Sequence, residues 1–290
     1  MQDTNNKIIP SISLLLAGFG YALYGPLSRI VGNEFGPIGQ TLSRSLIRLI
    51  MIIVIIFLFK IKLKKIAKKD IYWFTLLAAS AAFCTLFYIP AIIHLPFGLT
   101  MFLFYALGTI SSYFAGYILF KEKLNTSKIV ALILAVIGLA VMFVESVHLV
   151  NNLYLIFACA SGFFYGLYSP FSKKLTNSYS LTQSIFITII AEFFIYLVSW
   201  FVFRDNIFVV SVKPWLANLL YAFDVMIITY LVFYGFRHLE AQIGSLLILS
   251  ELIFIILIGL IFYNEVPTTM QLVGGALIIF GMVVPQFAKK

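Results

Sequence analysis

Ten long apolar segments restrict the folds that this chain can adopt. Each has roughly the length of 20 apolar residues that a helix needs to cross a bilayer. The strands of a membrane barrel would be about half as long and would alternate in polarity. We therefore predict an all-α integral membrane protein with ten transmembrane helices. The predicted spans are 10–31, 38–59, 71–93, 98–120, 128–147, 153–171, 181–203, 215–236, 240–262 and 269–287.

The composition excludes a soluble protein. The chain has 290 residues, of which 62% are hydrophobic and 11% are charged. Soluble domains carry about 25% charged residues. The first apolar segment is long and follows Lys7 directly, so we expect it to be retained and not cleaved as a signal peptide.

Positive charge is distributed unevenly among the connectors. If the N-terminus is cytoplasmic, cytoplasmic segments hold 15 Lys and Arg residues and the opposite side holds three. This asymmetry is the positive-inside rule, and it predicts that both termini are cytoplasmic. The rule also explains the lysine run at 60–69, so a nucleic-acid or phosphoinositide site is not needed to account for it. The run contains Lys60, Lys62, Lys64, Lys65, Lys68 and Lys69.

A repeat divides the chain into two halves. The segment "GFGYALYGPLSR" at 18–29 returns as "GFFYGLYSPFSK" at 162–173, an offset of 144. Further matches, at an offset of 143, pair 120–122 with 263–265 and Gly138 with Gly281. We therefore predict five-helix repeats at 1–147 and 148–290. Because five is odd, the second repeat must enter the membrane from the opposite side. Secondary transporters use inverted repeats of this kind for alternating access.

Two segments carry a resemblance to a known family. "YILFKEKLNTSKIVALILAVIGLAVMF" (117–143) and "GLIFYNEVPTTMQLVGGALIIFGMVV" (259–284) resemble the EamA-type carriers of the drug/metabolite transporter superfamily. The segment 236–259 resembles the penultimate hairpin of that family. The family usually has proline after the glutamate there, but Leu252 follows Glu251, and this departure weakens any prediction of a helix break at this point.

The resemblance implies a carrier in a bacterial plasma (inner) membrane. The family moves amino acids, sugars, nucleotide derivatives and drugs. We expect a secondary transporter or exporter of small polar organic metabolites, such as amino acids, working by alternating access with possible proton or ion coupling. The alternatives are a carrier for choline-like organic cations and, in another class, a non-transporting membrane scaffold or sensor. No nucleotide-binding loop, Ser-His-Asp set or HExxH motif occurs, so we expect neither an enzyme nor a cofactor.

Five charged residues lie inside the predicted spans and away from the span ends, where each costs about 2.5–3.5 kcal/mol on insertion scales. Glu192, Asp224 and Glu251 are candidates to bind a substrate ammonium or a coupling proton, and Arg44 and Arg48 to bind a substrate carboxylate. Internal pairing is the alternative. Arg48 and Glu192 are repeat equivalents and could pair, although Arg48 could also pair with Asp224 or Glu251. Arg44 could instead extend to the membrane interface.

The repeated motif supplies candidates for a cavity wall or gate. Proline inside a helix removes a hydrogen bond and kinks the backbone, while tyrosines three residues apart share a helix face. A packing kink with interfacial tyrosines is the alternative. The candidate residues are Tyr21, Tyr24, Pro26, Tyr165, Tyr168 and Pro170.

The remaining polar residues have structural explanations. We expect Glu122 and Glu265, each at a hairpin, to cap the helix that follows. His94 and His238 lie at span ends, where turn capping or interfacial placement is favoured over proton relay. Cys84 and Cys159 lack metal-like spacing, so we expect no metal site and interpret them as small apolar residues in lipid-facing helices.

Overall fold

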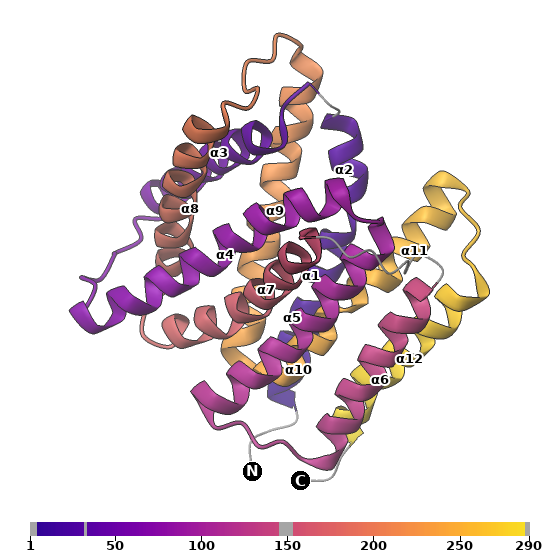
Figure 1. Cartoon of the computed structure of the whole chain (residues 1–290). Coiled ribbons are helices and arrows are strands. Elements are labelled where there is room, and N and C mark those ends of the chain that lie inside the picture. Colours follow the sequence, from indigo (N-terminus) through magenta and orange to yellow (C-terminus); the bar gives the residue numbers. More distant parts are fainter. Residues whose placement is uncertain (1–4, 32–33, 145–152, 288–290) are drawn as a thin grey trace.

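A computed structural model describes residues 5–31, 34–144 and 153–287, and within these ranges the secondary structure is entirely helical (Figure 1). Nine described helices are long and apolar enough to span a membrane, and a shorter apolar helix covers Thr269–Pro285. Together they give the ten spans that the sequence predicts. The predicted end of the fifth span at 147, and the predicted boundary between repeats, lie outside the described residues.

Eight spans are single helices, and several match their predicted limits within a few residues. The single helices are α3 (Pro37–Leu58), α4 (Lys68–His94), α5 (Phe97–Phe120), α6 (Thr126–Phe143), α7 (Tyr154–Thr176), α8 (Leu181–Phe203), α9 (Val212–His238) and α12 (Thr269–Phe287). The first span is divided into α1 (Asn5–Ala22) and α2 (Tyr24–Val31). The ninth is divided into α10 (Ala241–Ile248) and α11 (Ser250–Tyr263).

The two prolines of the repeated motif have different effects. Helix α1 ends at Ala22, four residues before Pro26. Because proline has no N–H, Pro26 cannot donate the helical hydrogen bond to the Ala22 carbonyl. Pro170 lies inside α7, which continues to Thr176 without interruption. Helix α7 packs along both α4 and α5.

The ninth span breaks at Leu249 although no proline is present there, and the sequence did not predict this break. Leu249 and Leu252 donate backbone hydrogen bonds three residues back, to Leu246 and Leu249, and so tighten the junction. Helix α1 approaches the junction closely, since a Cβ on Gly18 would lie 3.0 Å from the Glu251 nitrogen. A charged residue, Glu251, is thereby placed at an irregular point in the middle of the membrane.

The helix contacts follow the internal repeat. Helix α3 packs against its equivalent α8, and α6 packs against its equivalent α12 (Figure 1). Where α6 and α12 cross, a Cβ on Gly138 would lie 2.8 Å from the Gly274 carbonyl oxygen. In the equivalent contact, a Cβ on Gly281 would lie 3.0 Å from the Ala131 carbonyl oxygen. These reciprocal contacts indicate a pseudo-twofold axis between two inverted halves.

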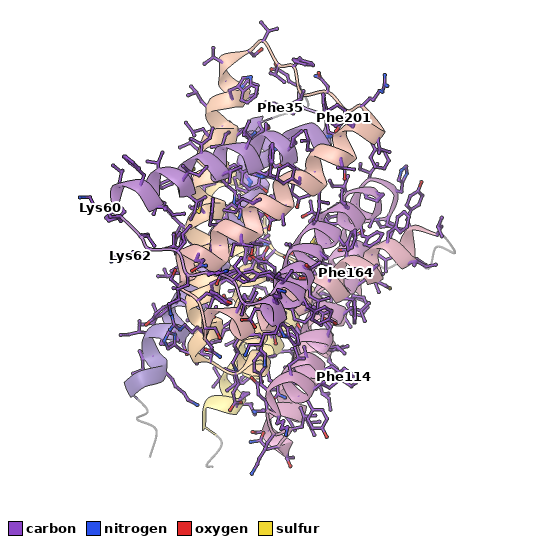
Figure 2. The ribbon with its side chains drawn as sticks, turned by 90° about the vertical axis from the view of Figure 1, so that its left-hand side faces the viewer. Phe35, Lys60, Lys62, Phe114, Phe164 and Phe201 are labelled. Atoms are coloured by element: carbon purple, nitrogen blue, oxygen red, sulfur yellow. The ribbon has the colours of Figure 1, made fainter. Side chains whose placement is uncertain are left out.

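The outer surface is apolar, as contact with a lipid bilayer requires. Phe57, Phe114, Phe201 and Phe262 have 81%, 65%, 63% and 74% of their surface exposed. Phe114 and Phe201 project outward from the bundle in Figure 2. Buried positions, in contrast, include many polar and charged side chains. Apolar residues outside and polar residues inside identify an integral membrane protein.

Helix α1 begins and α12 ends at the same end of the bundle, near the N and C markers of Figure 1. We call this end the termini side and the other end the opposite side. The connectors after α3, α5, α7 and α9 lie on the termini side, and those after α2, α4, α8 and α11 lie on the opposite side.

Candidate functional site

A buried ion pair joins the two repeats at mid-membrane. Arg48 is the twelfth residue of α3, and Glu192 is the twelfth residue of α8. Arg48 Nη1 donates a hydrogen bond of 2.9 Å to Glu192 Oε2, and Nη2 lies 3.4 Å from Thr229 Oγ1. The two side chains are only 9% and 6% exposed. Of the partners that the sequence left open for Arg48, the structure shows the repeat equivalent, Glu192, and the pairing offsets part of the cost of burying both charges.

One turn before Arg48, Arg44 contacts an aromatic ring, and no ion pair among the described residues joins it to a carboxylate. Its guanidinium carbon lies 4.0 Å from the centre of the Tyr221 ring, within cation–π range. Tyr221 contacts Tyr24 edge to face at 4.8 Å, and Tyr24 contacts Tyr21 at 5.3 Å. The Arg44 Nη1 atom is buried without a hydrogen-bond partner among the described residues. This nitrogen is available to a ligand with an acceptor oxygen.

The two remaining carboxylates of the predicted site lack a cationic partner among the described ion pairs. Asp224, near the middle of α9, is half-buried, and its Oδ2 atom has no hydrogen-bond partner within the part of the chain that the structure describes. Glu251, next to the break in the ninth span, is 8% exposed and lies within hydrogen-bonding reach of the Tyr105 hydroxyl. Tyr21 interacts electrostatically with both carboxylates, which places them around one region.

Several tyrosines outside the predicted site surround this region. Tyr88 and Tyr105 lie near Glu251, and Tyr196 lies near Glu192. Thr229, which contacts Arg48, was also missed. These residues fall outside the repeated motif, and a tyrosine in a membrane span ordinarily indicates the interface. No sequence signal distinguished them from lipid-facing residues.

Cys84 was interpreted as a small apolar residue in a lipid-facing helix, but the structure places it beside polar groups. Its thiol interacts with Glu192 and with the hydroxyl groups of Tyr21 and Tyr88, so it faces the polar interior. A helix that is apolar on all sides does not reveal from its sequence which face turns inward. A single cysteine does not reveal that face either. Both cysteines are free. Among the described residues, no group of three or more His, Cys, Asp or Glu side chains could hold a metal.

The second copy of the tyrosine motif lies closer to the termini side. Tyr165 packs on Phe104 at 4.5 Å, and its hydroxyl has no partner among the described residues. Tyr168 packs on Phe233 at 5.6 Å. A cavity of about 10 Å³, enough for one water, adjoins Tyr165 and includes Ser112 and Ser245 in its lining. The structure therefore places Tyr165 and Tyr168 in the interior and not at the membrane interface.

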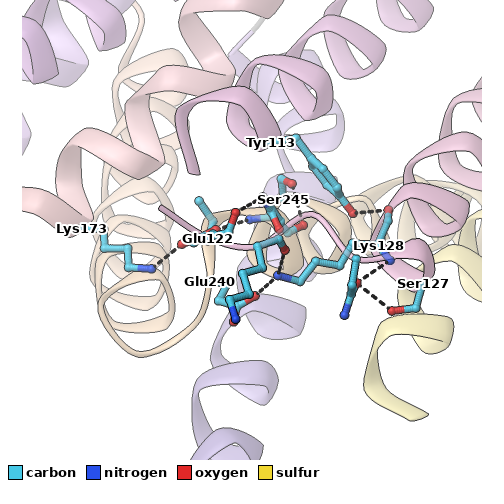
Figure 3. Close-up of polar contacts among 11 residues, drawn as sticks. Tyr113, Glu122, Ser127, Lys128, Lys173, Glu240 and Ser245 are labelled. Carbon is cyan, nitrogen blue, oxygen red and sulfur yellow. Dashed lines mark hydrogen bonds and ion pairs between the residues drawn. The ribbon is translucent and has the colours of Figure 1, made fainter. Parts of the chain in front are cut away.

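Glu122 of the first repeat forms hydrogen bonds with residues of the second repeat on the termini side (Figure 3). Its Oε1 atom accepts hydrogen bonds from Lys173 Nζ at 2.7 Å and from the Ala241 N–H at 2.9 Å. Its Oε2 atom accepts from the Gln242 N–H at 3.3 Å. The expected role as a helix cap is correct, but the capped helix is α10 of the other repeat. The following helix, α6, is capped by Asn125.

A second ion pair lies beside Glu122. Lys128 pairs with Glu240, and its ammonium group also donates to the Lys123 carbonyl at 2.8 Å (Figure 3). Ser112 of α5 donates to the Ala241 carbonyl at 3.2 Å. We call Glu122, Lys173, Lys128, Glu240 and Ser112 the termini-side network. It links α5 and its connector to the start of α10 and the end of α7.

The equivalent glutamate on the opposite side has a different environment. Glu265 is exposed, whereas Glu122 is 7% exposed. Helix α12 is capped by Thr268, whose hydroxyl accepts from the Gln271 N–H at 3.2 Å. The Gln271 side chain accepts from the Thr268 N–H at 2.9 Å, which completes a capping box.

The two histidines end equivalent helices. His94 is the last residue of α4 and stacks on Tyr154 at 4.1 Å. His238 is the last residue of α9, and its Nδ1 atom bonds the Tyr234 carbonyl at 2.8 Å. The His238 contact confirms the expected turn capping.

The fold and the buried charges define an integral membrane protein with two inverted repeats and a polar interior. The model of the EamA-like transporter family matches residues 8–144 and 152–284, one match in each repeat. The chain belongs to this family. It is therefore a membrane transporter of small solutes.

The same architecture occurs among solved structures. One, described only as a crystal structure of a protein, has a TM-score of 0.81 and 15% sequence identity. The alignment covers 96% of this chain and 97% of the other. At this identity the likeness shows the fold alone. A search of curated proteins found no match.

Proposed function

We propose that the protein is a secondary transporter of small polar organic metabolites that carry a cationic nitrogen, with amino acids as the first candidates. The main support is the position of Asp224 and Glu251. Both lie at mid-membrane, where an uncompensated carboxylate is costly, and Arg48 is already paired with Glu192. A substrate ammonium, or a coupling proton, would offset this cost.

The surroundings suggest how an amino acid would be oriented. Its ammonium group would lie near Asp224 and Glu251, and its carboxylate would accept hydrogen bonds from the unpartnered Nη1 of Arg44. A tyrosine-rich environment also suits a quaternary ammonium through cation–π contacts. Choline-like cations are therefore the second candidates, since they need the carboxylates and the aromatic rings but not Arg44.

Alternating access would use the inverted repeats. In this conformation the termini-side network connects the repeats with a buried carboxylate that caps α10. We propose that this network is the closed gate on the termini side and that it opens when the repeats exchange conformations. Tyr21, Tyr24 and Pro26, beside the interruption in the first span, would form part of the cavity wall.

The proposed location is the plasma (inner) membrane of a bacterium, with both termini in the cytoplasm. The support is the excess of Lys and Arg in the connectors of the termini side. In this orientation the termini-side network is the cytoplasmic gate.

The experiment is uptake into liposomes that contain the purified protein. A panel of radiolabelled amino acids and choline-like cations would be tested with and without an imposed pH gradient, and protein-free liposomes would be the control. We expect saturable uptake of at least one member that has a cationic nitrogen. Uptake equal to that of protein-free liposomes for the whole panel would favour the non-transporting scaffold or sensor.

A further inference from the structure

The lysine-rich connector between α3 and α4 is exposed, yet its backbone is fixed to the rest of the protein. The Lys64 N–H donates to Gln183 Oε1 at 2.9 Å, and the Lys64 carbonyl accepts from Gln183 Nε2 at 2.6 Å. The Ala67 N–H donates to the Tyr179 hydroxyl at 3.0 Å. Lys60 and Lys62 project from the edge of the molecule in Figure 2. The four lysines of the connector are exposed, as are Lys68 and Lys69 at the start of α4.

An apolar groove begins where the lysines end. It has a volume of about 200 Å³ and lies between the start of α4 and the middle of α8. Ile66 of the connector belongs to its lining, so the groove continues directly from the connector. The other lining residues are Ile71, Phe74, Thr75, Ile187 and Ala191.

A lysine and two of the residues that line the groove lie on the same face of α4. Lys68, Ile71 and Thr75 are separated by three and four residues in α4 and therefore share one helix face. Lys65 directly precedes Ile66. A basic rim thus adjoins an apolar groove at the end of two membrane spans, the level at which lipid headgroups meet acyl chains.

We propose that this surface binds an anionic phospholipid. The ammonium groups of Lys64, Lys65 and Lys68 would bind the headgroup phosphate, and part of an acyl chain would occupy the groove. Basic pockets between membrane helices on the cytoplasmic side bind anionic lipid headgroups in this way. The positive-inside rule explains the number of lysines. It does not require a fixed backbone or an adjoining groove.

The test is native mass spectrometry of the full-length protein with added phosphatidylglycerol or phosphatidylcholine. We expect wild type to retain phosphatidylglycerol preferentially. The triple variant K64Q/K65Q/K68Q should lose roughly a hundredfold in affinity for it, since each lysine near a charged lipid surface contributes measurably. The matched control is K121Q/K123Q/K213Q, which removes three other exposed lysines and should behave as wild type.

A second variant removes the groove and keeps every charge. Ala191→Phe places a large ring in the groove and should also weaken phosphatidylglycerol binding, while topology is unaffected. Equal binding by A191F and wild type would overturn the proposal, as would equal losses in the two lysine triples. Equal retention of phosphatidylcholine and phosphatidylglycerol by wild type would overturn it as well. Competition by millimolar inorganic phosphate would indicate a free-anion site and would also contradict the proposal.

Discussion

Arg48 and Glu192 are equivalent residues of the two repeats, and they contact each other at 2.9 Å. Two symmetry-equivalent residues can touch only where the axis passes close to both. The contact therefore places the pseudo-twofold axis between α3 and α8 at mid-membrane. Opposite charges at these equivalent positions allow the repeats to meet there, where two identical charges would repel each other.

The first prediction is that this pair stabilises the fold. Arg48→Glu or Glu192→Arg would place two like charges in contact in the interior. Removing one partner of a buried pair costs about 3–5 kcal/mol, and we expect each single exchange to cost at least that much. The double exchange should recover a substantial part of the loss. The loss and its recovery would be measured from the abundance of each variant in the membrane and from its thermal midpoint in detergent. A double variant no better than the worse single variant would show that the contact contributes little.

The second prediction concerns topology. In a background without Cys84 and Cys159, a cysteine at exposed Lys123 should react with an impermeant thiol reagent only after the cells are permeabilised. A cysteine at exposed Glu265 should react in intact cells. The ten spans and the positive-inside count both require this result. Labelling of both positions from one side would contradict the inverted repeat.

The sequence predicted the ten spans and the inverted repeat, because these depend on apolar length and on the repeat offset. The same offset placed Glu192 among three candidate partners of Arg48. The sequence did not predict the break at Leu249, since tertiary contact with α1 at Gly18 accompanies that break and no proline marks it. Glu122 was assigned the correct role but the wrong helix, because its partner is 119 residues away. The tyrosines near Glu251 were missed because nearly uniform apolar helices do not reveal which face turns inward.

The third prediction separates a binding role from a structural role for the unpaired carboxylates. Asp224→Asn and Glu251→Gln should each reduce uptake at least tenfold. Neutralising a buried, uncompensated carboxylate removes a desolvation cost, so the thermal midpoint should stay constant or rise. Exposed Glu34→Gln is the matched control. Wild-type uptake in both variants, or a large fall in midpoint, would support internal pairing instead.

The fourth prediction is that Glu122 holds the termini side closed. Glu122→Gln weakens a contact with Lys173 and two N–H donors, and hydrogen bonds to charged groups contribute about 1.5–3 kcal/mol. Labelling of Ser245→Cys from the termini side, in the background without Cys84 and Cys159, should increase by about tenfold or more.

Glu240→Gln is the comparison for this experiment. Its partner is Lys128, but the Glu240 side chain is 39% exposed, against 5% for Glu122, so the gate should respond less to its loss. Equal labelling of Ser245→Cys in the Glu122→Gln variant and its parent would exclude Glu122 as a gate residue.

The most direct measurement is the reactivity of the native Cys84 thiol, which lies beside Tyr21 and Glu192 in the polar interior. The Cys159→Ser protein, in membranes of known orientation, would be exposed to an impermeant thiol reagent from each side in turn. Cys84→Ser/Cys159→Ser would give the background. Alternating access predicts slow labelling of Cys84 from both sides, and a transported solute should change both rates. Labelling from one side only, or from neither, would contradict the account.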